Sequence, residues 1–155
     1  MMPCPEETPD QRVQRFVALC RRHGVRLTPQ RLALFQELAC TRTHPTTDEL
    51  YTRLRCRLPN LSIDTVYRML GKLHEWGAVR RLEVLDDQSR YEVNLVPHHH
   101  FVCVCCRRTE DVHWPELDAL PWPDGVGSLG SVEWLHAEFR GRCAACVDAS
   151  APRRA

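Results

Sequence analysis

The 155-residue chain lacks the features that mark membrane, secreted and disordered proteins. It contains no run of about 18 consecutive apolar residues, so we expect no membrane span. Its first residues have neither the basic nor the apolar region of a secretory signal, and we therefore expect a cytoplasmic protein. Aromatic residues are scarce at 7%, but 43% hydrophobic and 26% charged residues are a composition that can bury a core.

Lysine is nearly absent, with a single lysine against 20 arginines, and the charge is unevenly distributed. The formal net charge is +1, yet the segment from Arg12 to Arg81 holds 14 basic and 5 acidic residues. Residues 97–155 hold 6 basic and 8 acidic residues. A basic first half predicts a polyanion-binding module joined to a different second module. A solvated basic surface without a partner is the alternative.

Capping signals and glycines bound four helical segments in the first half. Thr28 before Pro29 is a typical helix start, and Thr-Thr-Asp-Glu at 46–49 is a capping box. Gly24 and Gly77 follow helical patterns and are expected to end them. With apolar residues at helical spacing, the predicted helices cover about residues 11–23, 28–40, 46–58 and 62–76.

A change of hydrophobic period follows the fourth helix. Residues 78–85 and 89–93 alternate in polarity around 86–88, which predicts a β-hairpin. Helices followed by a hairpin on a basic segment are typical of a winged helix-turn-helix, whose fourth helix would enter the DNA major groove. A plain helical bundle is the alternative. The candidate DNA-binding residues are Arg26, Thr28, Arg31, Asp64, Thr65, Tyr67, Arg68 and Lys72.

The predicted fold class is α+β, with a DNA-binding domain at residues 1–95 and a small α/β dimerisation domain at 96–148. Residues 1–10 are expected to be a disordered leader and 149–155 a tail. In the second domain, strands are predicted at about 99–104, 109–114 and 131–140, around a proline- and glycine-rich stretch at 115–130. So small a module has little core and is expected to need a metal clamp and a partner subunit.

Nine cysteines without an export signal do not indicate a disulfide framework. The pairs Cys103/Cys106 and Cys143/Cys146 have the CxxC spacing of a tetrahedral structural zinc site. A thioredoxin-like redox pair would need a βαβ context and one pair. Cys105 could replace a neighbouring ligand, although a spare thiol is the simpler interpretation. The remaining cysteines have no pairing pattern and are expected to be buried or incidental: Cys4, Cys20, Cys40 and Cys56.

Three consecutive histidines indicate a second metal site. In a strand, His98 and His100 project to one face, whereas Cys103 projects to the other. Glu92 and Asp111 are acidic residues near them in the predicted arrangement. Nitrogen and oxygen donors of this kind suit Fe(II), Mn(II) or Zn(II).

Taken together, these motifs resemble the ferric uptake regulator (Fur) family of metal-dependent repressors across about residues 12–147. The matching stretches are residues 26–31 (Arg-Leu-Thr-Pro-Gln-Arg), 44–46 (His-Pro-Thr), 49–51 (Glu-Leu-Tyr), 64–68 (Asp-Thr-Val-Tyr-Arg), 91–92 (Tyr-Glu), 98–100 (His-His-His) and both CxxC pairs.

The resemblance implies a homodimer that binds a two-fold symmetric operator in double-stranded DNA. It assigns structural Zn²⁺ to the four CxxC cysteines and a regulatory Fe²⁺ or Mn²⁺ to a site joining the two domains. Metal binding would favour one interdomain arrangement through its differential affinity for that state. The implied regulatory ligands are His44, Glu92, His98, His100 and Asp111.

Within the family, the aspartate at Asp111 is typical of the peroxide-sensing branch, whereas iron sensors have glutamate at this position. Glu92 departs from the peroxide-sensing branch. A peroxide sensor would use bound Fe(II) and hydrogen peroxide to oxidise His44 or His98, and so release DNA. Mn(II) would repress without that reaction. An iron-responsive or other metal-level repressor is the alternative. A weaker third metal site is a candidate at His99, Asp118 and His136.

Two other function classes fit less of the sequence. A metal-dependent hydrolase would need an open coordination position and a base in a pocket, and no nucleophile motif or phosphate loop is present. A hydrolase would also leave the basic half unused. A zinc-stapled interaction module without DNA binding is the third class, and operator binding left intact by Arg68→Ala would favour it. We therefore expect a regulator, with no enzymatic activity and no small organic substrate.

Overall fold

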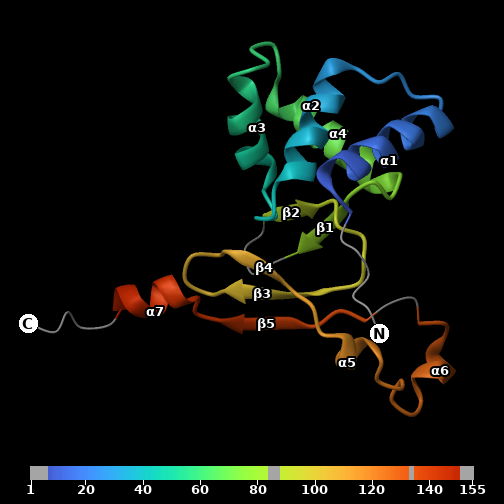
Figure 1. Ribbon diagram of the computed structural model, residues 1–155, viewed down its shortest axis with the longest axis vertical. Helices are drawn as coiled ribbons and strands as arrows, with labels where there is room; N and C mark the ends of the chain where they lie inside the picture. Colours follow the sequence, from blue (N-terminus) through green and yellow to red (C-terminus); the bar gives the residue numbers. More distant parts are fainter. Residues whose placement is uncertain (1–6, 84–87, 133–134, 151–155) are drawn as a thin grey trace, which may run out of the picture. The chain divides into compact units, whose positions relative to one another are not determined.

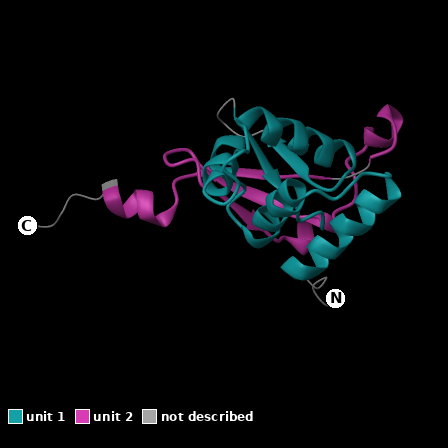
Figure 2. Ribbon diagram, turned by 90° about the horizontal axis from the view of Figure 1, so that it is seen from above, with its two compact units in different colours: residues 1–96 teal, residues 97–155 magenta. Residues whose placement is uncertain are grey.

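The computed structural model describes residues 7–83, 88–132 and 135–150, and the chain divides into two compact units. Unit 1 is residues 1–96 and unit 2 is residues 97–155 (Figures 1 and 2). Within the described ranges, no helix has the length and apolar character needed to cross a membrane.

Unit 1 is a helical domain that ends in a hairpin (Figure 1). The β1–β2 hairpin is antiparallel and pairs Arg80 with Glu92, and its connecting residues 84–87 lie outside the described residues. The α+β class and the predicted order of helices and hairpin are confirmed. The elements are α1 (Pro9–Arg22), α2 (Pro29–Cys40), α3 (Thr47–Arg55), α4 (Ile63–Glu75), β1 (Arg80–Glu83) and β2 (Ser89–Glu92).

The predicted capping residues begin three of these helices. The hydroxyls of Thr28, Thr46 and Ser62 each accept a hydrogen bond from the backbone N–H three residues later. At α3, the Glu49 carboxylate also accepts from the backbone N–H of Thr46, which completes the predicted capping box.

Two helix boundaries differ from the prediction. Helix α1 begins at Pro9, because Thr8 and Gln11 form a capping box, so two residues of the predicted leader are helical. Residues 1–6 of that leader lie outside the described residues. Helix α3 ends at Arg55 instead of residue 58, because the Leu54 carbonyl accepts from the backbone N–H groups of both Arg57 and Leu58, which tightens the last turn ahead of Pro59.

Helix packing in unit 1 fixes which face of α4 is exposed. The rings of Phe16 and Phe35 stack with centroids 4.3 Å apart between α1 and α2. Val66, Leu70 and Leu73 of α4 are buried in the same core, because their spacing places them on one side of the helix. The opposite side of α4, the helix that follows the short turn after α3, therefore does not pack in this core and can contact other molecules.

Unit 2 is a three-stranded sheet with short helices. Strand β3 (His99–Cys103) lies between β4 (Thr109–Val112), which is antiparallel to it, and β5 (Glu138–Gly141), which is parallel. The helices are α5 (Pro115–Asp118), α6 (Val126–Leu129) and α7 (Ala144–Ser150).

The second half of unit 2 differs from the sequence prediction. The third strand begins at Glu138 instead of residue 131, and residues 133–134 of the predicted strand lie outside the described residues. Helix α7 was not predicted, and it includes the first two residues of the predicted tail. Residues 115–130 form only one-turn helices, in keeping with Pro121 and Pro123 between them.

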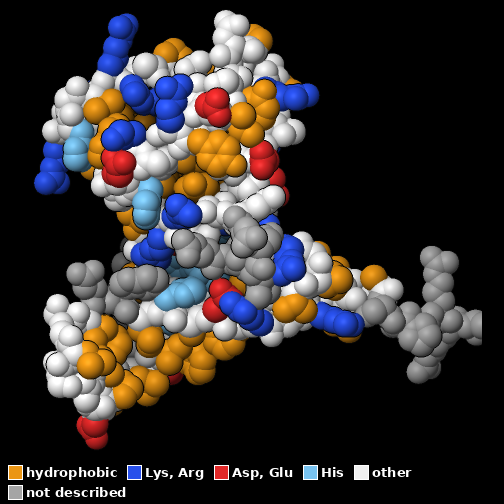
Figure 3. All heavy atoms as spheres, turned by 180° about the vertical axis from the view of Figure 1, so that it is seen from behind, with side chains coloured by type: hydrophobic (Ala, Val, Ile, Leu, Met, Phe, Trp, Pro, Cys, Tyr) orange, Lys and Arg blue, Asp and Glu red, His pale blue; other side chains and the backbone are white. Residues whose placement is uncertain are grey.

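Unit 2 buries few hydrophobic side chains. Among its described residues, only Val102 and Cys103 are buried hydrophobics. Large apolar side chains are instead exposed, and Figure 3 shows hydrophobic side chains gathered over the α5–α6 stretch. The prediction that this module has little core of its own is confirmed. Its exposed large hydrophobic residues are Val104, Trp114, Leu120, Trp122, Leu129, Val132, Phe139 and Val147.

Candidate metal centres and DNA-facing surface

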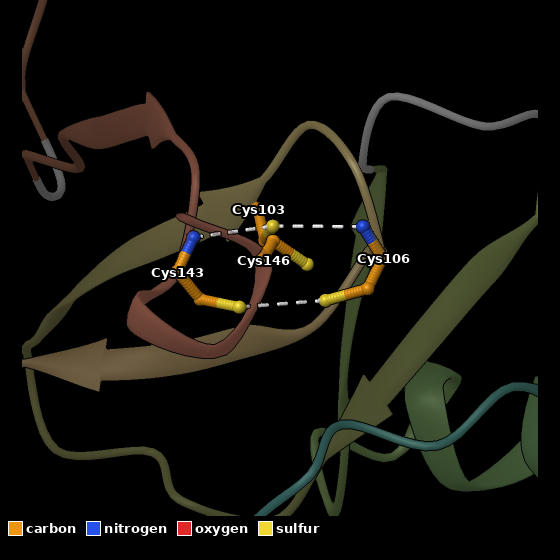
Figure 4. Close-up of side chains that lie close together, drawn as sticks. All are labelled: Cys103, Cys106, Cys143 and Cys146. Carbon is orange, nitrogen blue, oxygen red and sulfur yellow. Dashed lines mark hydrogen bonds between the residues drawn. The ribbon is translucent and has the colours of Figure 1, made fainter. Parts of the chain in front are cut away.

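The two CxxC pairs meet at one end of the sheet of unit 2 (Figure 4). Cys103 ends β3, Cys106 lies in the turn after it, and Cys143 and Cys146 lie at the start of α7. The four sulfur atoms are within 4.8 Å of one another, and Sγ of Cys106 is 3.7 Å from Sγ of Cys143. Sulfurs at about 2.3 Å from a tetrahedral Zn²⁺ would be about 3.8 Å apart, so these residues fit that ion.

Backbone donors stabilise a negative charge at this cluster. The N–H groups of Cys106 and Cys143 donate to Sγ of Cys103 at 3.5 and 3.3 Å, and they lower the pKa of the Cys103 thiol to about 6. The adjacent thiols of Cys143 and Cys106 raise the pKa of Cys146. Four thiols this close cannot lose their protons independently, because neighbouring thiolates repel one another. A bound cation would relieve that repulsion. Cys105 is exposed and does not belong to the group.

In unit 2, three nitrogen and oxygen donors converge beside β3. Nε2 of His98 is 3.0 Å from Nε2 of His100, and Oδ1 of Asp111 is 3.6 and 3.8 Å from these atoms. Asp111 is placed there by the β3–β4 ladder, in which it pairs with His100. Donors at about 2.1 Å from one ion, at right angles, are about 3.0 Å apart, so the two imidazoles fit adjacent positions around a cation.

In unit 1, His44 and Glu92 form a second set of nitrogen and oxygen donors. Nε2 of His44 is 3.1 Å from Oε2 of Glu92, and both side chains are buried. The segment that contains His44 is held against β2 by backbone contacts. The carbonyl of Pro45 accepts a hydrogen bond from the Tyr91 N–H at 3.1 Å, and Thr46 forms an isolated β-bridge with Arg90. The unit therefore orients an imidazole and a carboxylate toward each other.

His44 has a left-handed backbone with φ of 48°. Such a conformation is costly for a residue with a Cβ and persists where surrounding contacts impose it. The contact here is Arg90, whose Nη1 donates to the His44 carbonyl at 3.0 Å.

The second arginine of the hairpin contacts the carboxylate itself. Nη1 of Arg80 donates to Oε1 of Glu92 at 3.1 Å, and its Nη2 donates to the Leu95 carbonyl at 3.4 Å. Neither Arg80 nor Arg90 is among the residues predicted from the sequence, because the pairing of Arg80 with Glu92 depends on the exact register of the hairpin.

The residues of the third candidate site are only partly brought together. Nε2 of His99 is 3.4 Å from Oδ1 of Asp118. His136, in contrast, places its Nε2 at 2.7 Å from Nδ1 of His100. Within the described residues, the groups able to hold a metal do not include this set. The ring centroids of His99 and His136 are 6.5 Å apart, and the third site stays a prediction.

A basic hollow lies between α2 and α4 in unit 1. Arg31, Thr65, Arg68, Met69 and Lys72 line a cavity of about 270 Å³, so four of the eight predicted DNA-binding residues share one surface.

The other four predicted DNA-binding residues lie near this hollow. Tyr67 is 51% exposed and Asp64 is exposed on the first turn of α4. The carbonyl of exposed Arg26 accepts from Nη1 of Arg31 at 2.7 Å. Thr28 uses its hydroxyl to cap α2.

A winged helix-turn-helix unit followed by a unit with metal-ligand clusters defines the class of metal-responsive transcriptional regulators. Residues 22–121 match the model of the Ferric uptake regulator family. The chain belongs to the ferric uptake regulator family, whose members are repressors and not enzymes. The prediction of a repressor and the prediction that the protein is not an enzyme are thereby confirmed.

Curated relatives carry a more specific name. The chain is 38% identical over 114 residues to the peroxide-responsive repressor PerR of Staphylococcus epidermidis, covering 74% of this chain and 76% of that protein. It is 35% identical over 142 residues to PerR of Staphylococcus aureus (strain USA300), covering 92% and 96%.

Solved structures share the fold. The Campylobacter jejuni peroxide stress regulator matches with a TM-score of 0.65 and 28% identity, covering 84% of this chain and 98% of that one. The Helicobacter pylori ferric uptake regulator matches in fold with a TM-score of 0.75 at 21% identity, covering 96% and 100%.

The hydrogen bonds to Cys103 predict a pH-dependent thiolate in the metal-free protein. Its pKa of about 6 lies below the usual 9.0, so its contribution to stability is fully present above pH 9.0 and is lost as the pH falls through about 6. The ultraviolet absorbance of thiolates should rise in a step near pH 6. We expect Cys103→Ser to abolish that step and Cys105→Ser to preserve it; a first step near pH 9 would contradict the assignment.

Proposed function

We propose that this chain is a peroxide-responsive repressor whose regulatory metal site takes ligands from both units. The observation that carries the proposal is the pair of donor sets. His44 and Glu92 face each other in unit 1, and His98, His100 and Asp111 converge in unit 2. An ion bound by all five would hold the two units in one arrangement. The PerR name of the relatives at 35–38% identity supports the same function.

Bound Fe(II) would supply the reduction of hydrogen peroxide beside an imidazole ring, whereas Mn(II) would occupy the ligands without that chemistry. The net change inserts one oxygen atom from hydrogen peroxide into an imidazole C–H bond of His44 or His98 and leaves water. An oxidised ring is a poorer ligand, so the chain loses the differential affinity that favours the DNA-binding arrangement. DNA is then released.

The proposed partner is a two-fold symmetric operator bound by a homodimer. The hollow lined by Arg31, Arg68 and Lys72 would supply positive charge for phosphates, and Tyr67 and Asp64, which are exposed on α4, are the proposed contacts to base edges. The exposed apolar side chains of unit 2 supply a surface that a second copy would cover.

The four clustered cysteines are proposed to hold structural zinc. We expect one tightly bound zinc per chain, retained in Cys105→Ser and lost in Cys143→Ser, measured by metal analysis after gel filtration. Because unit 2 has little core, chelation or Cys143→Ser should also lower its melting temperature, whereas Cys105→Ser should not. Zinc retained by Cys143→Ser but lost by Cys105→Ser would show that Cys105 is the ligand.

Arg68 and Lys72 are proposed to contact DNA phosphates. Arg68→Ala and Lys72→Ala should each weaken operator binding and reduce the slope of log K against log salt by about 1. Arg21→Ala, which removes an equal charge from the exposed end of α1, is the control and should change neither. Fluorescence anisotropy over a salt series measures both quantities. Equal slopes for all three variants would place DNA on another surface.

Peroxide sensing is tested by loading the zinc-containing protein with Fe(II) or Mn(II) without oxygen. Micromolar hydrogen peroxide should abolish operator binding of the Fe(II) form only, and mass spectrometry should find one added oxygen on the peptide of His44 or His98. Binding that survives in both forms would instead favour an iron-responsive or other metal-level repressor. The control is His113→Ala: the His113 ring centroid is 6.0 Å from that of His98, but His113 is outside the donor group, so this variant should oxidise like the unchanged protein.

A further inference from the structure

Glu92 is the one proposed ligand that departs from the peroxide-sensing pattern, and the structure shows how its longer carboxylate is held. Oε2 lies 3.1 Å from Nε2 of His44, the other proposed ligand of unit 1. Oε1 accepts a hydrogen bond from Nη1 of Arg80 at 3.1 Å. The two oxygens therefore have different partners.

Besides its hydrogen bond to Glu92, two further contacts fix the position of Arg80. Its Cα is paired with that of Glu92 across the hairpin, so the two side chains leave neighbouring strands side by side. Its other terminal nitrogen, Nη2, donates to the Leu95 carbonyl at 3.4 Å. The side chain of Glu92 is 3% exposed and that of Arg80 is 25% exposed, so water competes weakly for this ion pair.

We propose that Arg80 is a positioning residue that restricts Glu92 to one-oxygen ligation. A carboxylate that gives both oxygens to a metal fills two coordination positions, whereas one that keeps an oxygen on a guanidinium fills one. With His44, His98, His100 and Asp111, a one-oxygen Glu92 makes five ligand atoms and leaves a position open for peroxide. This inference rests on the proposed five-residue site, and it explains how a chain with Glu92 can still react with peroxide.

The test compares Arg80→Met, which keeps the apolar stem, with Arg81→Met. Arg81 is the next residue of β1; it is paired with Tyr91 instead of Glu92, and its Nε donates to the Ser89 hydroxyl at 2.7 Å, so its loss removes an equal charge from the same strand at a different register position. Each protein is loaded with zinc and then with Co(II), because five-coordinate Co(II) absorbs visible light more strongly than six-coordinate Co(II). Mn(II) dissociation constants are measured alongside.

Arg80→Met should lower the Co(II) absorption several-fold and tighten Mn(II) binding, while Arg81→Met should match the unchanged protein. In the Fe(II) form, Arg80→Met should slow histidine oxidation by peroxide about tenfold or more. Tighter Mn(II) binding with unchanged Co(II) absorption would mean that Arg80 acts only through its charge, which would overturn the inference. Unchanged values in every measurement would also overturn it.

Failure of the proposed function has a different signature. If the unchanged Fe(II) protein is never oxidised, peroxide sensing is wrong, yet the Co(II) spectra still decide whether Arg80 limits Glu92 to one oxygen. Should Arg80→Met fold poorly, Arg80→Lys serves as the second variant. Lysine keeps the charge but lacks the planar fork that spans Glu92 and Leu95, so the Co(II) absorption should fall in the same direction. Absorption unchanged in Arg80→Lys, with the fold intact, would contradict the fork's role.

Discussion

The shortage of buried apolar area in unit 2 is the constraint on which the rest of that unit depends. Its sheet has three short strands, and Val102 and Cys103 are the buried hydrophobics among its described residues. Hydrophobic burial cannot stabilise so small a module alone. We propose that a metal bound by the four cysteines compensates, because it would join the turn after β3 to the start of α7. At the other end of β3, His98 just before the strand and His100 within it lie beside the strand that carries Asp111.

Much of the fold follows from local chemistry that the sequence displays. Thr28, Thr46 and Ser62 begin helices because a short side-chain oxygen can satisfy the free N–H groups of the first turn. The CxxC pairs and the histidine run are equally local signals, and the structure gathers both sets of side chains. Helix α7 was missed, since its seven residues, Ala144–Ser150, show too little apolar periodicity to distinguish a helix from a tail.

The parts that sequence could not give depend on register and on contacts between distant segments. Arg80 and Arg90 look like ordinary charges of a basic domain, and only the ladder shows that one faces Glu92 and the other holds the His44 carbonyl. His136 illustrates the reverse case. The sequence singled it out for a third metal site, yet its contact with His100, at 2.7 Å between Nε2 and Nδ1, could not be read from any local pattern. Such placements follow from the sheet as a whole, which no local pattern encodes.

The left-handed backbone at His44 limits what evolution can place there. The conformation costs an ordinary L-residue about 1 kcal/mol or more, and β-branched residues more still, whereas Gly, Asn, Asp and His itself adopt it more readily. Asn and Asp are therefore the substitutions that keep both an accessible backbone and a metal-ligating atom. A lineage that abandoned imidazole at this position would be expected to reach an oxygen ligand first. Its sensor would then lack an oxidisable ring in unit 1 without any change in the surrounding fold.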